Sequence, residues 1–230
     1  MNIEEFFIMG RRVKYWKRRK VLKGIGVEYP WELLCAMDRL LNSQHFDNFI
    51  HPDSDIAKDV KIIGAIHVGR GSKIKRGTVI EGPCYIGDNC EIGHYNVLRG
   101  PLNIENDVKT GAYTEVKHCA VQKDTHTHSG YFGDSVIGES CRFGAGFVTA
   151  NRRVDRGSIS VVLNDEKVDT GLTYLGAIIK NHVKFGIHCG TMPGVVVGDG
   201  SMIGPATHVF KSLGDGATLY AKFENALKYE

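Results

Sequence analysis

Aliphatic residues recur at every sixth position through the middle of this chain. The series runs Ile56, Ile62, Val68, Ile74, Ile80, Ile86, Ile92, Leu98 and Ile104. A helix repeats about every 3.6 residues and a strand about every second residue, so neither produces this spacing. The pattern predicts short strands joined by turns and wound into a prism, with these residues inside it. The fold class is therefore an all-β solenoid of hexapeptide repeats, a parallel β-helix.

The repeat changes phase once. Val116 keeps the first register, but Ile137, which opens the second series, follows it by 21 residues, which is not a multiple of six. The winding must therefore be irregular between residues 117 and 133. That stretch contains the densest group of titratable side chains in the chain: His118, His126, His128 and Tyr131. Irregular turns often lie beside active sites, so we expect a functional site here.

The repeat divides the chain into three parts. Residues 1–48 form an N-terminal cap with a basic helical segment, and a second helix is expected over residues 31–41, just after Pro30. Residues 49–213 form the β-helix, with an inserted loop at 152–176 that contains a hairpin. Residues 214–230 form a C-terminal helical cap, in which the spacing from Leu219 to Lys228 predicts a helix that plugs the end of the prism.

Charge and composition exclude several classes of protein. The net charge is +3, with 42% hydrophobic residues, as in an ordinary globular protein. The basic run over residues 11–20 is typical of a solvated helix face or an arm that binds anions, and no nucleic-acid fold signature accompanies it. Apolar runs are too short for a membrane span. The six cysteines form no CxxC pair, which favours reduced thiols in a cytoplasmic protein.

Several segments resemble one known family. They are residues 29–34 (YPWELL), 144–155 (GAGFVTANRRVD), 168–171 (VDTG), 175–179 (LGAII) and 192–195 (MPGV). This sequence is similar to the acetyltransferase half of bifunctional sugar-1-phosphate nucleotidylyltransferase/acetyltransferases, particularly the archaeal type. The resemblance implies a left-handed β-helix that assembles as a homotrimer. It also implies N-acetyl transfer from acetyl-CoA to an amino-sugar phosphate. The nucleotidyltransferase half has no counterpart in the first 48 residues, so such an enzyme is a possible partner.

The resemblance also implies roles for individual residues. The stretch 128–134 (HSGYFGD) places His128 at the position of the general base and Glu115 near it. Arg99 and Lys117 take the positions that bind the sugar phosphate. The remaining implied contacts to the substrates are Tyr131, Arg142 and Asn151 for the sugar and Ala145, Ile187 and Pro205 for the acyl-CoA. No metal is firmly implied.

This set of residues makes chemical sense for acyl transfer. An amine attacks a thioester only when it is neutral, so a base must take its proton, and histidine titrates in the required range. A carboxylate such as Glu115 could fix the tautomer of His128. Arginine and lysine together match the charge of a sugar phosphate.

One residue departs from the family pattern. The family has asparagine where this chain has Arg142, and a cation there would repel an ammonium group and can only donate hydrogen bonds. That change indicates a different acceptor, another acyl group or lost activity. Two alternatives therefore stay open: a non-catalytic trimer that binds a sugar phosphate or a partner enzyme, and a zinc enzyme like the γ-class carbonic anhydrases. The pairs His126 with His128 and His182 with His188 do not reproduce that zinc pattern.

Overall fold

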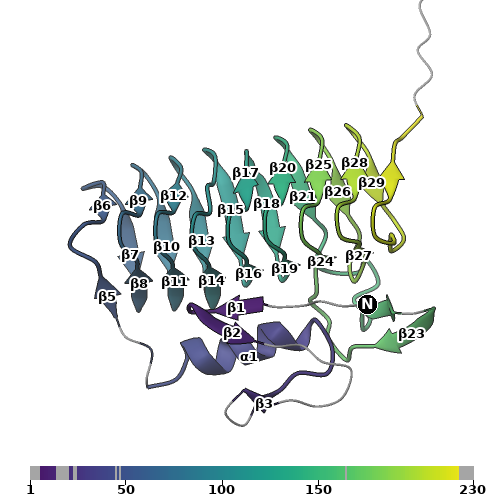
Figure 1. The fold of residues 1–230 in the computed structure, drawn as a ribbon, viewed down its shortest axis with the longest axis horizontal. Coiled ribbons are helices and arrows are strands. Elements are labelled where there is room, and N and C mark those ends of the chain that lie inside the picture. Colours follow the sequence, from purple (N-terminus) through teal and green to yellow (C-terminus); the bar gives the residue numbers. More distant parts are fainter. Residues whose placement is uncertain are drawn as a thin grey trace, which may run out of the picture.

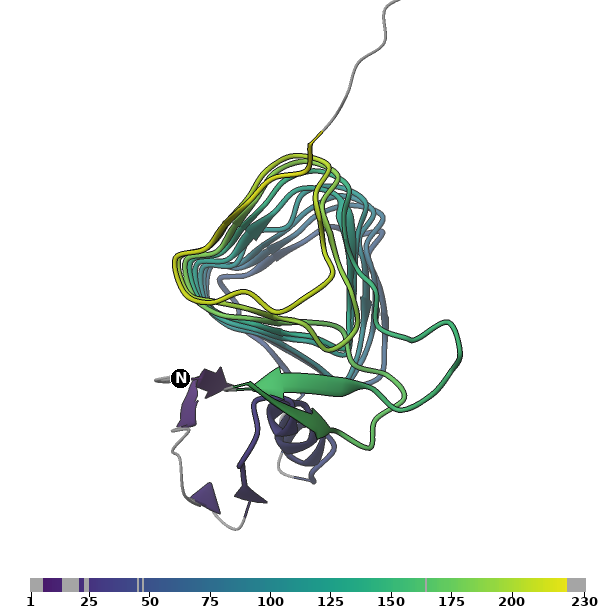
Figure 2. The ribbon, with the colours of Figure 1, turned by 90° about the vertical axis from the view of Figure 1, so that its right-hand side faces the viewer.

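The computed structural model describes residues 6–13, 21–22, 25–44, 46, 48–163 and 165–222. Within them the chain winds into a three-sided coil (Figures 1 and 2). Two sides are eight-stranded sheets, and the third is made of shorter sheets of three and five strands. We call the two eight-stranded sheets the side sheet and the floor sheet, and the third side the roof face. The floor sheet is the one that faces the helix. The predicted all-β solenoid of hexapeptide repeats is confirmed.

The strands of each side are short and parallel. The side sheet contains β7 (Lys61–Ile63), β10 (Val79–Glu81), β13 (Val97–Arg99), β15 (Thr114–Lys117), β18 (Gly130–Gly133), β21 (Phe147–Thr149), β26 (Gly190–Thr191) and β29 (His208–Val209). The floor sheet contains β5 (Phe49–Ile50), β8 (Ile66–Val68), β11 (Cys84–Ile86), β14 (Leu102–Ile104), β16 (Ala120–Val121), β19 (Val136–Ile137), β24 (Ile178–Ile179) and β27 (Val196–Val197). The roof face contains β6 (Asp55–Ile56), β9 (Lys73–Ile74), β12 (Glu91–Ile92), β17 (His126–Thr127), β20 (Arg142–Phe143), β25 (Lys184–Phe185), β28 (Met202–Ile203) and β30 (Thr218–Leu219).

The hexad residues line the interior, as the repeat predicts. Ile80, Ile86 and Ile92 are fully buried, one on each side of a single coil. The inward residues are partly buried at the two ends of the described coil, at Ile56 and Ile62 in the first coil and at Leu213 and Leu219 in the last. All six cysteines are free, and five of them are buried within the coil, where they pack as small apolar side chains.

Four phenylalanines fill the middle of the prism. Their ring centroids lie 4.6–5.3 Å apart; the rings are those of Phe132, Phe143, Phe147 and Phe185. Such contacts between aromatic rings add to the free energy gained by burying their area. This cluster supports the coils that carry the irregular turns.

We predict that Phe147→Ala lowers the free energy of unfolding by about 3–5 kcal/mol, because it empties a buried aromatic site. The matched control is Val148→Ala, the next residue, whose side chain points outward from the side sheet and is 45% exposed. That control should change stability by less than about 1 kcal/mol. Chemical denaturation of both variants tests this, and equal losses would contradict the assignment of the cluster as core.

The predicted irregularity consists of three shortened turns. In the regular coil, successive inward residues, each on the next side of the prism, are six positions apart in the sequence. The intervals from Val116 to Val121, Thr127 to Phe132 and Phe132 to Ile137 are each five residues. Together these three deletions account for the change of phase. Two of the turns lie between the side and floor sheets, and one lies between the roof face and the side sheet.

The N-terminal segment covers the floor sheet rather than an end of the prism (Figure 2). Its described elements are β1 (Phe6–Ile8), β2 (Arg11–Val13), β3 (Val21–Leu22), β4 (Ile25–Gly26) and α1 (Glu32–Leu41). The helix expected over residues 31–41 is present. The expected basic helical segment is wrong where it is described, because Arg11–Val13 forms a strand paired with β1. Residues 14–20 lie outside the described residues.

A glutamate in the first turn of the helix holds the segment ahead of it, and the helix docks by one face. The Glu32 carboxylate accepts hydrogen bonds from the backbone N–H groups of Glu28 and Tyr29 (2.5 and 3.1 Å), so it satisfies donors ahead of the helix. Leu34 and Met37 are buried in one apolar cluster with outward-facing residues of the floor sheet. Burial of this apolar stripe holds α1 against the coil.

A histidine at the first shortened turn ties α1 to the coil. The His118 ring contacts Asp134 through Nδ1 and Asp38 of α1 through Nε2, both at 2.8 Å. Burial lowers the pKa of His118, but these two carboxylates outweigh it and raise the pKa to about 9. The ring is therefore a protonated bridge between two carboxylates at neutral pH.

This bridge predicts a stability that depends on pH. The pKa in the folded protein exceeds the usual value of about 6.5, so the contribution is fully present below about pH 6.5 and is lost as the pH rises through 9. The stability difference between the wild type and His118→Asn should therefore narrow by on the order of 3 kcal/mol between pH 6 and pH 10. Thermal unfolding measures it, with His182→Asn as an exposed control. A difference independent of pH would contradict the bridge.

The insertion and the C-terminal end complete the fold. The predicted hairpin is present as β22 (Ser160–Leu163) paired antiparallel with β23 (Glu166–Asp169). It packs beside α1 through the buried Val161. The expected C-terminal helical cap is wrong at its start, because Thr218–Leu219 pairs in parallel with β28 and continues the coil past residue 213. Residues 223–230 lie outside the described residues.

Candidate functional site

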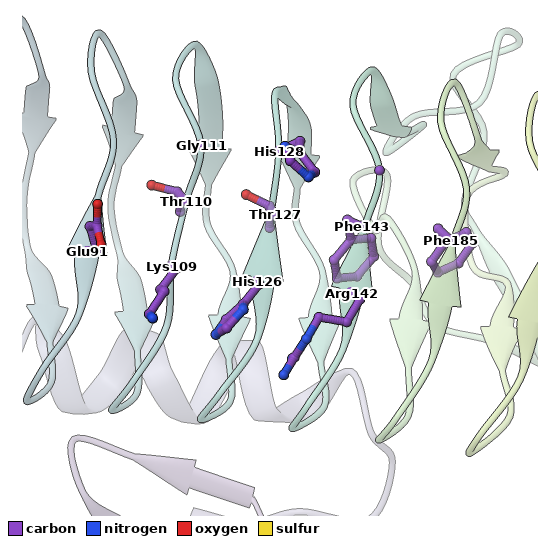
Figure 3. A pocket seen from close by; sticks show the side chains of 11 residues that line it. Glu91, Lys109, Thr110, Gly111, His126, Thr127, His128, Arg142, Phe143 and Phe185 are labelled. Atoms are coloured by element: carbon purple, nitrogen blue, oxygen red, sulfur yellow. The ribbon is translucent and has the colours of Figure 1, made fainter.

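A groove of about 530 Å³ runs over the roof face and contains His128 (Figure 3). It is lined by Glu91, Lys109, Thr110, Gly111, His126, Thr127, His128, Arg142, Phe143, Gly144 and Phe185. Its floor is therefore made of coil backbone and inward side chains, and its rim is made of charged side chains. Two residues expected at the site, His128 and Arg142, line this one groove.

His128 lies at the corner between the roof face and the side sheet, in one of the shortened turns. Its backbone N–H donates to the Phe143 carbonyl (3.0 Å), and its carbonyl accepts from the Thr114 hydroxyl (2.8 Å). The backbone is thus held from both neighbouring coils, while the ring is exposed to solvent. A fixed backbone with a free imidazole suits a group that exchanges protons with a ligand.

The coil below His128 approaches it closely. A Cβ atom placed on Gly111 would lie 3.0 Å from the His128 Cα. Only glycine accommodates that approach without moving the neighbouring turn. Gly111 therefore helps to set how closely the His128 turn packs against the preceding coil.

Gly111→Ala should shift the His128 turn by a few tenths of an ångström and destabilise the fold by about 1–3 kcal/mol through overpacking. Gly214→Ala is the control, because nothing lies within 4 Å of a Cβ there. Thermal unfolding and a crystal structure of each variant measure the two effects. An undisturbed His128 in Gly111→Ala would show that the contact is not needed.

Arg142 is held on the rim of the groove by Asp124. Its Nη2 donates to both Asp124 carboxylate oxygens (3.0 and 3.2 Å), and Asp124 also accepts from the Ser140 hydroxyl (2.8 Å). Burial raises the pKa of Asp124, but Arg142 and Ser140 outweigh it and lower the pKa. Burial and then Arg142 lower the pKa of His126, and the Asp124 carboxylate, 3.3 Å from its Nε2, opposes them.

The expected phosphate-binding residues lie on the adjoining side sheet. Arg99 and Lys117 are cross-strand partners, so their side chains leave the same face of the sheet. Arg99 is hydrogen-bonded to Glu115, and its buried Nε has no partner among the described residues. The Glu115 carboxylate thus orients Arg99. Its expected role in fixing the tautomer of His128 stays a prediction.

Asp134 joins the other expected residues into one network. Its carboxylate, 5% exposed, accepts from Lys117 Nζ (3.0 Å) and from Asn151 Nδ2 (2.5 Å). Asn151 also donates to the Tyr131 hydroxyl (3.0 Å). Burial raises the pKa of Asp134, but the hydrogen bonds from His118, Asn151 and Lys117 outweigh it and lower the pKa. The network fixes the side chains that face outward around it.

The expected acyl-CoA residues continue the corner that His128 begins. Gly146 N–H donates to the Ser129 carbonyl, His188 N–H to the Ala145 carbonyl and Ala206 N–H to the Ile187 carbonyl. His128, Ala145, Ile187 and Pro205 therefore occupy successive turns of one corner column. Ile187 is 52% exposed, so the column offers apolar surface at that turn.

Sequence reasoning missed several residues at this site. Asp134 ends the stretch 128–134, but its role as the centre of a network depends on the shortened turn.

Tyr174 of the insertion lies against the cations of the side face, with Lys117 Nζ 4.8 Å and Arg152 Cζ 4.6 Å from its ring centroid. Lys109 pairs with His126 across the roof, but counting a regular coil of 18 residues back from His126 gives Val108, because the first shortened turn lies between them. Within the described ranges, no group of three potential metal ligands is found.

Comparison with known proteins agrees with this geometry. Residues 65–100 match the bacterial transferase hexapeptide (six repeats) family. The bifunctional sugar-1-phosphate nucleotidylyltransferase/acetyltransferase of Sulfurisphaera tokodaii is 36% identical over 192 residues, which are 81% of this chain and 46% of the relative. The bifunctional protein GlmU of Methanococcus maripaludis strain C7 is 42% identical over 199 residues, or 86% and 47%. The uncharacterized acetyltransferase YaiX of Escherichia coli O6:K15:H31 is 29% identical over 203 residues, or 88% and 85%.

The chain spans about half the length of the bifunctional relatives that it matches. Its coil is built of hexapeptide repeats, and its sequence is similar to the C-terminal acetyltransferase half of the bifunctional sugar-1-phosphate enzymes. Among the described residues, no helix is long and apolar enough to cross a bilayer.

Proposed function

We propose that this chain transfers an acyl group from acyl-CoA to the amino group of an amino-sugar phosphate, with His128 as the general base. The observation that carries the proposal is the position of His128. Its exposed imidazole lies at a corner, with the groove on one side and the Arg99–Lys117 face on the other. The relatives, named as acetyltransferases, support the same reaction class.

The proposed step follows from the chemistry of a thioester. The amine nitrogen attacks the thioester carbonyl, a C–N bond forms and the C–S bond breaks. His128 takes the proton that the nitrogen loses and returns it to the departing thiolate, so CoA leaves as the free thiol. The amine must be neutral to attack, which makes this proton transfer necessary.

The side face supplies the contacts for the sugar phosphate. Arg99 and Lys117 would pair with the phosphate, and Tyr131 and Asn151 would contact the sugar. Glu115 and Asp134 hold the two cations in place before the ligand arrives. Preorganised cations lose less conformational entropy when the phosphate binds. The corner column of Ala145, Ile187 and Pro205 would take acetyl-CoA.

The proposed assembly is a homotrimer in which a second copy closes the site. The groove and the side face are open in a single chain, and an adjoining prism would shield the reaction from water. A nucleotidyltransferase that uses the acylated sugar phosphate is the proposed partner, since the curated relatives carry both activities in one chain. We propose a cytoplasmic location, where acyl-CoA and sugar phosphates occur.

A non-catalytic trimer that binds a sugar phosphate is the second candidate. Arg142 is the observation that favours it, because its guanidinium occupies the groove where an approaching ammonium group would be repelled. The two candidates differ in turnover and share the phosphate contacts.

His128→Ala should lower kcat by about 10²–10⁴-fold, with a smaller change in KM, because the proton acceptor is lost and the phosphate contacts remain. Release of free CoA thiol with hexosamine 1-phosphates measures it. His208→Ala, an exposed histidine three coils away on the side sheet, is the control. Unchanged turnover in His128→Ala would exclude the proposed base. Phosphate binding without turnover in the wild type would favour the binding protein.

A further inference from the structure

The roof groove carries a row of cationic and imidazole side chains next to His128. Lys109, His126 and Arg142 occupy successive rungs of the roof face and point the same way (Figure 3). Neighbouring strands are about 5 Å apart, so Lys109 and Arg142 flank His126 on both sides. The row thus presents one cation on each side of the His126 ring.

The carboxylates nearby leave this row with excess positive charge. Glu91 forms an ion pair with Lys75, and Asp124 forms one with Arg142. Lys109 is exposed and forms no ion pair among the described residues, and its cross-strand neighbour Glu91 is the one held by Lys75. Arg142 is fixed on Asp124 by the two Nη atoms.

The groove is also larger than an acetyl group requires. About 530 Å³ is the volume of a small-molecule site, whereas the acyl part of acetyl-CoA is only a methyl and a carbonyl. The space between His128 and the Lys109–Arg142 row is thus large enough for a substituent of one substrate. A carboxylate there would give Lys109 a counter-charge beside the Arg142–Asp124 pair, whereas a neutral or cationic substituent would leave Lys109 without one as the groove loses water.

We propose that the roof groove binds a carboxylate carried by one of the two substrates, close to the reacting carbon or nitrogen, through Lys109 and Arg142. This inference rests on the proposed function and deepens it, since it names an acidic substrate class. The carboxylate could belong to the acyl donor, as in a dicarboxylic acyl-CoA, or to the acceptor, as in an amino sugar with an oxidised carbon. In both cases Arg142 selects the substrate.

The experiment compares matched substrates that differ by one carboxylate. Acetyl-CoA and succinyl-CoA are the donor pair, each with glucosamine 1-phosphate. Glucosamine 1-phosphate and its C6-carboxylate analogue are the acceptor pair, each with acetyl-CoA. Calorimetric Kd and kcat/KM are measured for all combinations. The arm that shows the preference identifies which substrate carries the carboxylate.

The expected result is a preference of at least about 10-fold for the carboxylate in one arm, the size of one charge-assisted contact. Lys109→Gln and Arg142→Asn should each reduce that preference to less than about 3-fold. Lys184→Gln is the matched control, because Lys184 is the next rung after Arg142, is exposed, and does not line the groove. It should keep the preference.

Binding separates failure of this inference from failure of the proposed function. A carboxylate preference in Kd that the two variants abolish supports the groove assignment even if no acyl transfer occurs. Turnover with equal use of neutral and acidic substrates in both arms overturns the inference and leaves the acyltransferase intact. A preference that survives in both variants, or no preference in Kd or turnover, also overturns it.

Discussion

Every coil of this protein must return in register above the one before it, and that constraint governs the rest of the structure. Inward side chains stack only when equivalent residues meet, as Leu98, Val116 and Phe132 do along the side sheet. Regular coils meet the constraint with six residues per side. A side of five residues also meets it, provided that the lost residue comes from the turn and leaves the interior unchanged.

The three shortened turns show how a functional surface arises on such a regular frame. One brings His118 between two carboxylates and attaches α1. A second puts His128 at the corner with its backbone held by both neighbouring coils. The third places Asp134 where Lys117, His118 and Asn151 reach it. The interior stays packed, so the site residues are positioned by the same hydrogen-bond ladder that builds the fold.

Much of this arrangement could be predicted because the repeat has a fixed period. The inward residues and the irregular stretch follow from that spacing, and the hairpin of the insertion follows from two short strand patterns around a turn. Tyr174 could not be placed, since its position depends on how a non-repeating excursion returns to the coil. The predicted C-terminal helix is wrong at Leu219. That residue occupies an inward position of the roof face, and its packing in the coil outweighs the local helical spacing. The roles of Arg99 and Asn151 came from resemblance, and geometry adds their partners.

The central claim is that the His128 imidazole receives the proton of the attacking amine. A crystal structure of the protein with CoA and an amino-sugar phosphate tests it most directly. The account predicts a ring nitrogen of His128 within about 2.6–3.2 Å of the amine, or one water away, with the phosphate on Arg99 and Lys117. An amine bound beyond the reach of His128, with the sugar phosphate away from the side sheet, would contradict it.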